Sequence, residues 1–192
     1  MTDDRPVRAF FLTGPPGCGK TSLLREVLST LGVPAGGFFT EEVREGGRRA
    51  GFRLVTLDGR QAMLASVGRP GPVRVGRYGV NVAALDEVGV PALQEAIERE
   101  SLVVVDEIGK MEMASGAFRG AVERALGGGS VILGTILLAS NPWADAIKRR
   151  PEVQLIRLTF SDREGARERL VTLLRDCLAR RRQQGAATAG GG

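Results

Sequence analysis

The chain has 192 residues, which is enough for one sizeable hydrophobic core but not for two typical domains. Hydrophobic residues make up 43% and charged residues 26% of the sequence, so a fully disordered chain is excluded. The longest apolar run, residues 131–140, is too short for a membrane-spanning helix, and the polar start predicts no secretory signal. Because two cysteines cannot build a disulfide framework, we expect a cytoplasmic protein without a membrane partner.

The charged residues limit the chemistry that the protein can perform. A formal net charge of +5 favours an acidic partner, such as a nucleotide or a nucleic acid. The chain has no histidine, which excludes a Ser-His-Asp triad, a histidine general base and most catalytic zinc sites. Any catalysis must therefore use carboxylates, lysine, arginine or a metal bound by oxygen ligands.

Short β-rich runs alternate with helical periodicity, which predicts an α/β fold. The expected strands are Val7–Thr13, Gly37–Val43, Gly51–Leu57, Leu102–Asp106, Val131–Ile136 and Val153–Phe160. The expected helices are Lys20–Leu31, Ala92–Arg99, Ala117–Leu126, Pro142–Arg149 and a last one from Asp162 to about Arg182.

Three segments interrupt this alternation. Residues 37–57 predict a β-hairpin that is inserted directly after the first helix and turns at residues 45–48. Residues 66–83 are rich in glycine, proline and arginine, with a possible short strand near residues 77–82. Residues 1–184 are expected to form a single domain, and the Gly/Ala-rich residues 185–192 a disordered tail.

The strongest motif matches G-x-x-x-x-G-K-[ST] between an apolar strand and a helix, which is the setting that phosphate binding requires. Its residues are Gly14, Pro15, Pro16, Gly17, Cys18, Gly19, Lys20 and Thr21. The glycines allow backbone N–H groups to surround a triphosphate, and the positive end of the following helix points at the same phosphates. Lys20 would neutralise β- and γ-phosphate oxygens, and the Thr21 hydroxyl would ligate Mg²⁺.

A second motif places two carboxylates after an apolar run. The run is Leu102, Val103, Val104 and Val105, followed by Asp106 and Glu107. It predicts a buried parallel strand whose acidic residues lie at the carboxyl end, where open α/β sheets bind their ligands. Asp106 would hold Mg²⁺ directly or through water, and Glu107 would polarise a water molecule for attack on the γ-phosphorus.

Thr135 and the hairpin arginines could contact phosphate, but each also has a purely structural explanation. Thr135 could contact the γ-phosphate or the attacking water, or it could be there because β-branched residues fit strands. One of Arg44, Arg48 and Arg49 in the hairpin could stabilise charge that develops on the phosphoryl oxygens. The alternative for these arginines is a solvated hairpin edge.

The chain resembles the cancer-related nucleoside-triphosphatase family of small P-loop enzymes. The similar segments are residues 11–21, 37–52, 105–112 and 132–136, which look like the family's phosphate loop, inserted hairpin, acidic motif and following strand. The resemblance implies a RecA-like P-loop fold with a mainly parallel sheet, and Mg²⁺-dependent hydrolysis of ATP, GTP and other nucleoside triphosphates. It also implies nucleotide contacts at residues 14–21 and at Leu102, Val103, Val104, Val105, Asp106, Glu107, Ile108 and Gly109.

The loop after Ile136 departs from the family pattern, because residues 137–143 are not basic. Trp143, the only tryptophan, could stack on a nucleobase there or pack against the sheet.

Two other functions fit the same motifs. A small nucleoside or nucleotide kinase would use Glu107 as the base for an acceptor hydroxyl and residues 69–77 as a lid. A nucleotide-dependent module that binds nucleic acid or protein would explain the high pI, but a basic surface interleaved with aromatic residues is missing from the sequence. We favour slow hydrolysis by a monomer and expect no nucleic-acid partner.

Overall fold

The computed structural model describes the backbone of residues 6–189 and the side chains of residues 6–183. Its strands are β1 (Ala9–Thr13), β2 (Ala35–Glu45), β3 (Arg48–Thr56), β4 (Gln61–Val67), β5 (Arg74–Val75), β6 (Tyr78–Val80), β7 (Leu102–Ile108), β8 (Ile132–Ile136) and β9 (Val153–Arg157). Its helices are α1 (Lys20–Leu31), α2 (Val82–Ala84), α3 (Val90–Arg99), α4 (Gly116–Gly127), α5 (Pro142–Lys148) and α6 (Arg163–Ala189), with shorter turns η1 (Leu85–Gly89) and η2 (Glu112–Ala114).

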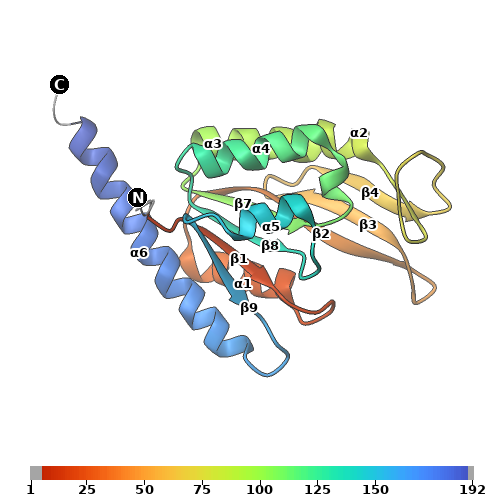
Figure 1. The fold of residues 1–192 in the computed structure, drawn as a ribbon, viewed down its shortest axis with the longest axis horizontal. Coiled ribbons are helices and arrows are strands. Elements are labelled where there is room, and N and C mark those ends of the chain that lie inside the picture. The colour runs from red at the N-terminus through yellow and green to blue at the C-terminus, as the bar shows by residue number, and fades with distance from the viewer. Residues whose placement is uncertain (1–5, 190–192) are drawn as a thin grey trace.

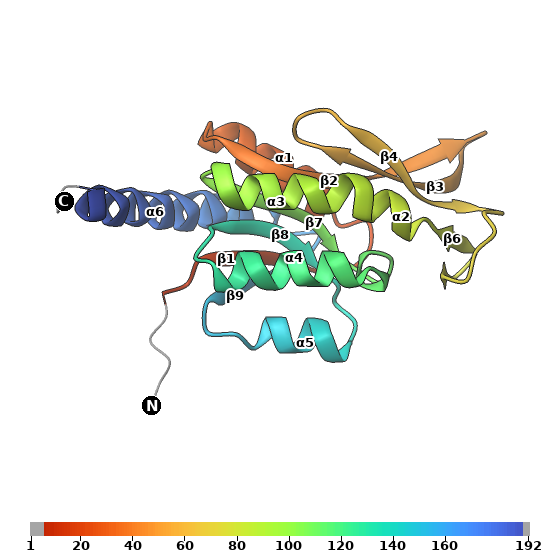
Figure 2. The same ribbon diagram turned by 90° about the horizontal axis from the view of Figure 1, so that it is seen from above.

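Within these residues the strands form one nine-stranded sheet in the order β5-β6-β4-β3-β2-β7-β8-β1-β9. Strands β2, β7, β8, β1 and β9 are parallel, and the strands beyond β2 are antiparallel. Helices α3, α4 and α5 cover one face of the sheet, and α1 and α6 cover the other (Figures 1 and 2). This arrangement confirms the expected α/β fold with a mainly parallel core sheet flanked by helices.

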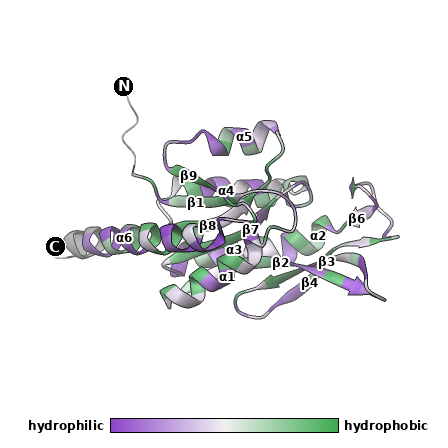
Figure 3. Cartoon of the chain, turned by 90° about the horizontal axis from the view of Figure 1, so that it is seen from below, coloured by the Kyte–Doolittle hydropathy of each residue, from purple (hydrophilic) through white to green (hydrophobic). Residues whose placement is uncertain are grey.

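The parallel strands are buried on both faces, as the apolar run before the carboxylates indicates. In β7, Val103 and Val105 pack with the residues of α3 and α4, whereas Leu102 and Val104 pack with those of α1 and α6. Figure 3 shows hydrophobic residues along the central strands, with hydrophilic residues on the β2–β3 hairpin and along α6. Because β8 lies between β1 and β7, the phosphate-loop strand and the acidic strand are separated by one strand.

The hairpin turns at Gly46 and Gly47, both at positive φ, as the sequence predicts. It is more than an insertion, since the first part of β2 pairs in parallel with β7 and the hairpin thereby extends the main sheet. Strand β4 was not expected from the sequence. Its residues 61–67 include only one β-branched residue, and its alanine, methionine and leucine favour helices, so its pairing with β3 overrides the local preference.

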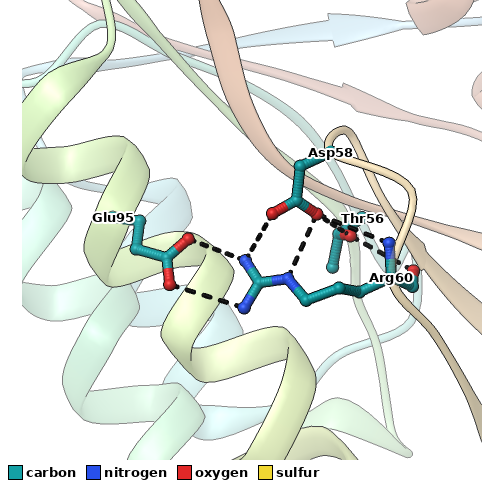
Figure 4. A network of polar contacts seen from close by, with 4 residues as sticks. All are labelled: Thr56, Asp58, Arg60 and Glu95. Carbon is teal, nitrogen blue, oxygen red and sulfur yellow. Dashed lines mark hydrogen bonds and ion pairs between the residues drawn. The ribbon is translucent and has the colours of Figure 1, made fainter.

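Arg60 connects the turn after β3 to helix α3 through ion pairs (Figure 4). Its guanidinium pairs with Asp58 at 2.8 Å and with Glu95 of α3 at 2.7 Å. Hydrogen bonds from Arg60 and Thr56 lower the pKa of Asp58 to about 2, so this carboxylate stays ionised over the whole neutral range. The antiparallel half of the sheet is thus tied to the helical layer above it.

Helix α6 is longer than expected. It continues to Ala189 rather than ending near Arg182, so residues 185–189, for which we expected disorder, are helical. Alanine and glutamine around Gly185 are good helix formers, and one glycine does not end the helix. The rest of the expected tail, residues 190–192, lies outside the described residues. None of the described helices combines the length and the apolar composition that crossing a membrane requires.

Candidate active site

The loop between β1 and α1 has the geometry of a phosphate-binding loop. Gly17 has a φ of 77° and Gly19 a φ of 86°, which are left-handed values that favour glycine. A Cβ on Gly14 would lie 2.4 Å from the carbonyl oxygen of Leu158, so a side chain has no room there. The Lys20 ammonium donates to the carbonyl oxygens of Gly14 at 3.1 Å and Pro15 at 3.0 Å, and it therefore lies inside the curve of the loop.

A cavity of about 990 Å³ lies above this loop, at the carboxyl ends of the parallel strands. Of the phosphate-loop motif, Gly14, Pro16, Gly17, Gly19, Lys20 and Thr21 line the cavity. Pro15 and Cys18 do not, and Cys18 is buried in the core against α1. Asp106, Glu107, Gly109 and Thr135 reach the same cavity from β7 and β8. The structure thus brings together the two motifs that lie about 85 positions apart in the sequence.

Asp106 is 2% exposed and hydrogen-bonded on one side only. Its Oδ1 accepts a hydrogen bond from Thr135 Oγ1 at 2.7 Å, and its backbone oxygen accepts one from Thr40 Oγ1, also at 2.7 Å. Its Oδ2 is buried and has no hydrogen-bond partner in the described part of the chain. Burial raises the pKa of Asp106, and the neighbouring Thr21 and Thr135 hydroxyls oppose that rise.

An unpartnered, buried carboxylate oxygen next to a threonine hydroxyl fits a magnesium ion, which prefers hard oxygen ligands. In the described residues no group of three or more acidic, histidine or cysteine side chains could hold a metal alone. In phosphate-transferring sites magnesium takes one or two carboxylates as protein ligands and completes its shell with phosphates and water. Thr21 and Asp106 are the residues that could hold it.

Glu107 and Glu112 flank Gly109. A Cβ on Gly109 would lie 2.8 Å from Glu112 Oε2 and 3.3 Å from Glu107 Cδ. Burial raises the pKa of Glu107, the charge of Asp106 raises it further, and the charge of Lys20 opposes this. Burial and the charge of Glu107 raise the pKa of Glu112 to about 8, so Glu112 is mainly neutral at pH 7. The sequence pattern gave Glu112 no role, although it belongs to the acidic motif.

The apolar residues expected to contact nucleotide lie elsewhere. Leu102, Val103, Val104 and Val105 are at most 1% exposed and form the first part of β7, and Ile108 at its end is also fully buried. None of these five side chains lines the cavity. They build the strand that places the two carboxylates.

The hairpin arginines divide into two groups. Arg49 lines the cavity, where it pairs with Glu42 and lies 5.6 Å from the centre of the Phe52 ring. Arg48 is exposed at the turn, and Arg44 pairs with the same Glu42 outside the cavity. Of these three arginines, Arg49 is therefore the one that lines the cavity.

Two further residues change the picture drawn from the sequence. Arg163, at the start of α6, donates from Nη1 to the carbonyl oxygen of Gly19 at 3.0 Å, a contact that no local pattern announces. Trp143 packs edge-on against Phe118 and donates from Nε1 to Glu123 at 3.0 Å. Of its two readings, the structure supports packing, because both its ring and its Nε1 already have partners on α4.

Comparison with known proteins gives consistent matches. A family model described as NTPase matches residues 9–171. The nucleoside-triphosphatase THEP1 of Thermotoga maritima is 42% identical over 164 residues, which cover 85% of this chain and 94% of that protein. The human cancer-related nucleoside-triphosphatase is 41% identical over 181 residues, covering 86% and 95%.

Two solved structures also match. The crystal structure of THEP1 from the hyperthermophile Aquifex aeolicus superposes with a TM-score of 0.80 at 36% identity, covering 86% of this chain and 98% of that one. The solution structure of a human cancer-related nucleoside triphosphatase gives a TM-score of 0.76 at 40% identity, covering 88% and 98%.

Proposed function

Since this chain belongs to the nucleoside-triphosphatase family, we propose that it hydrolyses ATP, GTP and other nucleoside triphosphates to the diphosphate and phosphate, with Mg²⁺ and with little selectivity for the base. The observation that carries the proposal is the meeting of Lys20, Asp106 and Glu107 in one cavity above a phosphate-binding loop. This set provides a phosphate anchor, a metal ligand and a base for water.

Binding of the triphosphate depends on the loop and on α1. Gly14, Gly17 and Gly19 of the loop and Lys20 at the start of α1 line the cavity, where glycine N–H groups and the positive end of the helix would favour negative charge. Lys20, which is bonded to loop carbonyls in this structure, would turn its other protons to phosphate oxygens. The phosphates are thereby held next to β7.

Thr21 and Asp106 would hold the metal. Mg²⁺ bound there supplies charge neutralisation on the phosphate oxygens during hydrolysis. The Thr135 hydrogen bond engages Oδ1 of Asp106, and its buried Oδ2 has no partner among the described residues, so Oδ2 is the oxygen that would bind the metal.

Glu107 would take a proton from the attacking water. It lies directly after Asp106, so its carboxylate is near the metal ligand and the Lys20 ammonium. Its raised pKa brings it towards the neutral range, where a general base works best. Arg49, which also lines the cavity, would stabilise charge on the phosphoryl oxygens.

The test is phosphate release from ATP, GTP, CTP and UTP with Mg²⁺ and with EDTA, for the wild type and for Glu107→Gln. Because general-base catalysis contributes about 10² to 10⁴-fold, turnover should fall by at least about 10²-fold while nucleotide still binds. Glu98→Gln, an exposed carboxylate on α3, is the matched control and should behave as the wild type. Full turnover by Glu107→Gln, or in EDTA, contradicts the proposed mechanism.

A phosphotransferase is the second candidate, because the cavity of about 990 Å³ is lined by apolar as well as charged side chains. Phe52, Val75 and Met111 are among them, and they could contact an acceptor molecule. Incubation with γ-labelled ATP and a panel of nucleosides and nucleotides separates the two functions. Label recovered as free phosphate supports hydrolysis, and label on an acceptor supports the kinase.

We also propose that the protein acts as a cytoplasmic monomer without a nucleic-acid partner. Cys18 and Cys177 are both free thiols, which fits a reducing compartment. Light scattering should give the monomer mass. Salt-dependent retention on immobilised DNA or RNA, or faster turnover in the presence of either, would contradict the proposed absence of a nucleic-acid partner.

A further inference from the structure

Phe160 is 73% exposed, the highest value among the large hydrophobic side chains of the described residues. A single exposed apolar residue is ordinary on a protein surface. Phe160 is of interest because of its position. It lies in the loop between β9 and α6, and this loop is at the same end of the sheet as the phosphate loop (Figure 1).

That loop contacts the phosphate loop at both of its ends. On the near side, Leu158 N donates to Thr13 O at 2.8 Å, and the Leu158 carbonyl oxygen closes over Gly14. On the far side, Arg163 donates to the carbonyl oxygen of Gly19. Phe160 therefore lies in the middle of a segment whose two ends contact the first and the last glycine of the phosphate loop.

The strand order decides which end of a nucleotide would lie there. The carboxylates that act on the γ-phosphate are on β7, and β8 separates β7 from the phosphate-loop strand β1. Phe160 follows β9, which pairs with β1 on its other edge. A triphosphate with its γ-phosphate beside Glu107 therefore extends its nucleoside away from β7, towards the β9 side.

We propose that Phe160 is the surface on which the nucleobase stacks. The inference rests on the proposed triphosphate binding and adds the site for the base. An aromatic face accepts every base, because each base has a π-face of its own, and a stacking contact of this kind explains low base selectivity better than paired hydrogen bonds do. Trp143 is the other candidate for this contact, but its ring packs against Phe118 and its Nε1 donates to Glu123.

The test measures equilibrium binding by calorimetry for the full chain, with ATP, GTP, CTP and inorganic tripolyphosphate as probes. Phe160→Leu keeps apolar volume but removes the aromatic face, and Phe160→Tyr retains it. Since base–aromatic stacking is worth about 5- to 100-fold in affinity, Phe160→Leu should weaken binding of the three nucleotides by about tenfold, and Phe160→Tyr should bind as the wild type. Tripolyphosphate, which has no base, should bind both variants and the wild type alike.

Leu155→Ala is the matched control, because Leu155 is an exposed apolar residue on β9 before the loop, and it should leave all affinities unchanged. Unchanged nucleotide binding by Phe160→Leu overturns the proposal, as does an equal loss for tripolyphosphate or a failure of Phe160→Tyr to restore binding. Because binding is read without turnover, an inactive but nucleotide-binding protein would refute the hydrolase proposal and leave this test intact.

Discussion

The Thr135 hydroxyl donates a 2.7 Å hydrogen bond to Asp106 Oδ1, and both side chains are almost completely buried. The pair joins β8 to β7 at the edge where the cavity opens. The sequence predicts Thr135 either as a direct phosphate contact or as an ordinary strand residue. Its observed partner is the carboxylate proposed to hold the metal, so it acts on that ligand.

Replacement of Thr135 by valine, which has the same shape, should therefore impair both stability and function. Loss of a buried hydrogen bond to a charged group should cost about 1–3 kcal/mol of the free energy of unfolding. It should also raise the Mg²⁺ concentration needed for half-maximal turnover. Urea unfolding and a Mg²⁺ titration measure the two effects. Thr135→Ser keeps the hydroxyl and should stay near the wild type, and a valine variant with normal Mg²⁺ dependence would refute this role.

Glu112 makes stability depend on pH. Its pKa is about 8 in the folded protein against an ordinary value of 4.5, so between these values the unfolded chain releases a proton that the folded chain keeps. The free energy of unfolding should thus fall as pH rises from about 4.5 to 8, by up to about 1.4 kcal/mol per pH unit. Glu112→Gln removes the ionisable group and should lose this slope.

Urea unfolding at pH 5, 6, 7 and 8 measures the difference between Glu112→Gln and the wild type. The difference should grow with each step in favour of the glutamine variant. Glu98→Gln, which changes an exposed carboxylate, should follow the wild-type slope. Equal slopes for all three proteins would show that Glu112 ionises normally.

Arg163→Ala should weaken nucleotide binding. The substitution removes the hydrogen bond to Gly19 O and the ion pair with Glu26, which together hold the start of α6 against the phosphate loop. We expect KM for ATP to rise about tenfold, consistent with loss of a charged hydrogen bond worth about 1.5–3 kcal/mol. Arg167→Ala, an arginine one turn later that pairs only with Glu164 in the described contacts, should keep its KM. Similar KM values for both variants would contradict this role of Arg163.

Arg49 and Arg48 provide a matched comparison, because they are neighbours and only Arg49 lines the cavity. Arg49→Ala should lower kcat by at least about tenfold, since an arginine at a transferring phosphoryl group can supply 10³- to 10⁵-fold. Arg48→Ala should leave kcat unchanged. Steady-state kinetics with ATP measures kcat for both variants. Equal kcat values would show that Arg49 has no role in catalysis.

The phosphate loop and the acidic strand could be read from the sequence because each is a run of consecutive residues. In residues 14–21 the glycine spacing and the flanking strand and helix already specify the loop. In β7 four apolar residues before two carboxylates specify a buried strand with its charges at one end. Both motifs are local, so no knowledge of strand order is needed to find them.

Strand order and side-chain contacts decided the rest. Strand β4 exists because β3 offers it a partner, although its residues favour a helix. Arg163 meets Gly19 from 144 positions away, and Thr135 meets Asp106 from 29 positions away. Which of two adjacent arginines reaches the cavity, and whether Trp143 or Phe160 is exposed, likewise depend on packing between distant segments. Local patterns carry no information on such contacts, because they form only when the chain folds and brings those segments together.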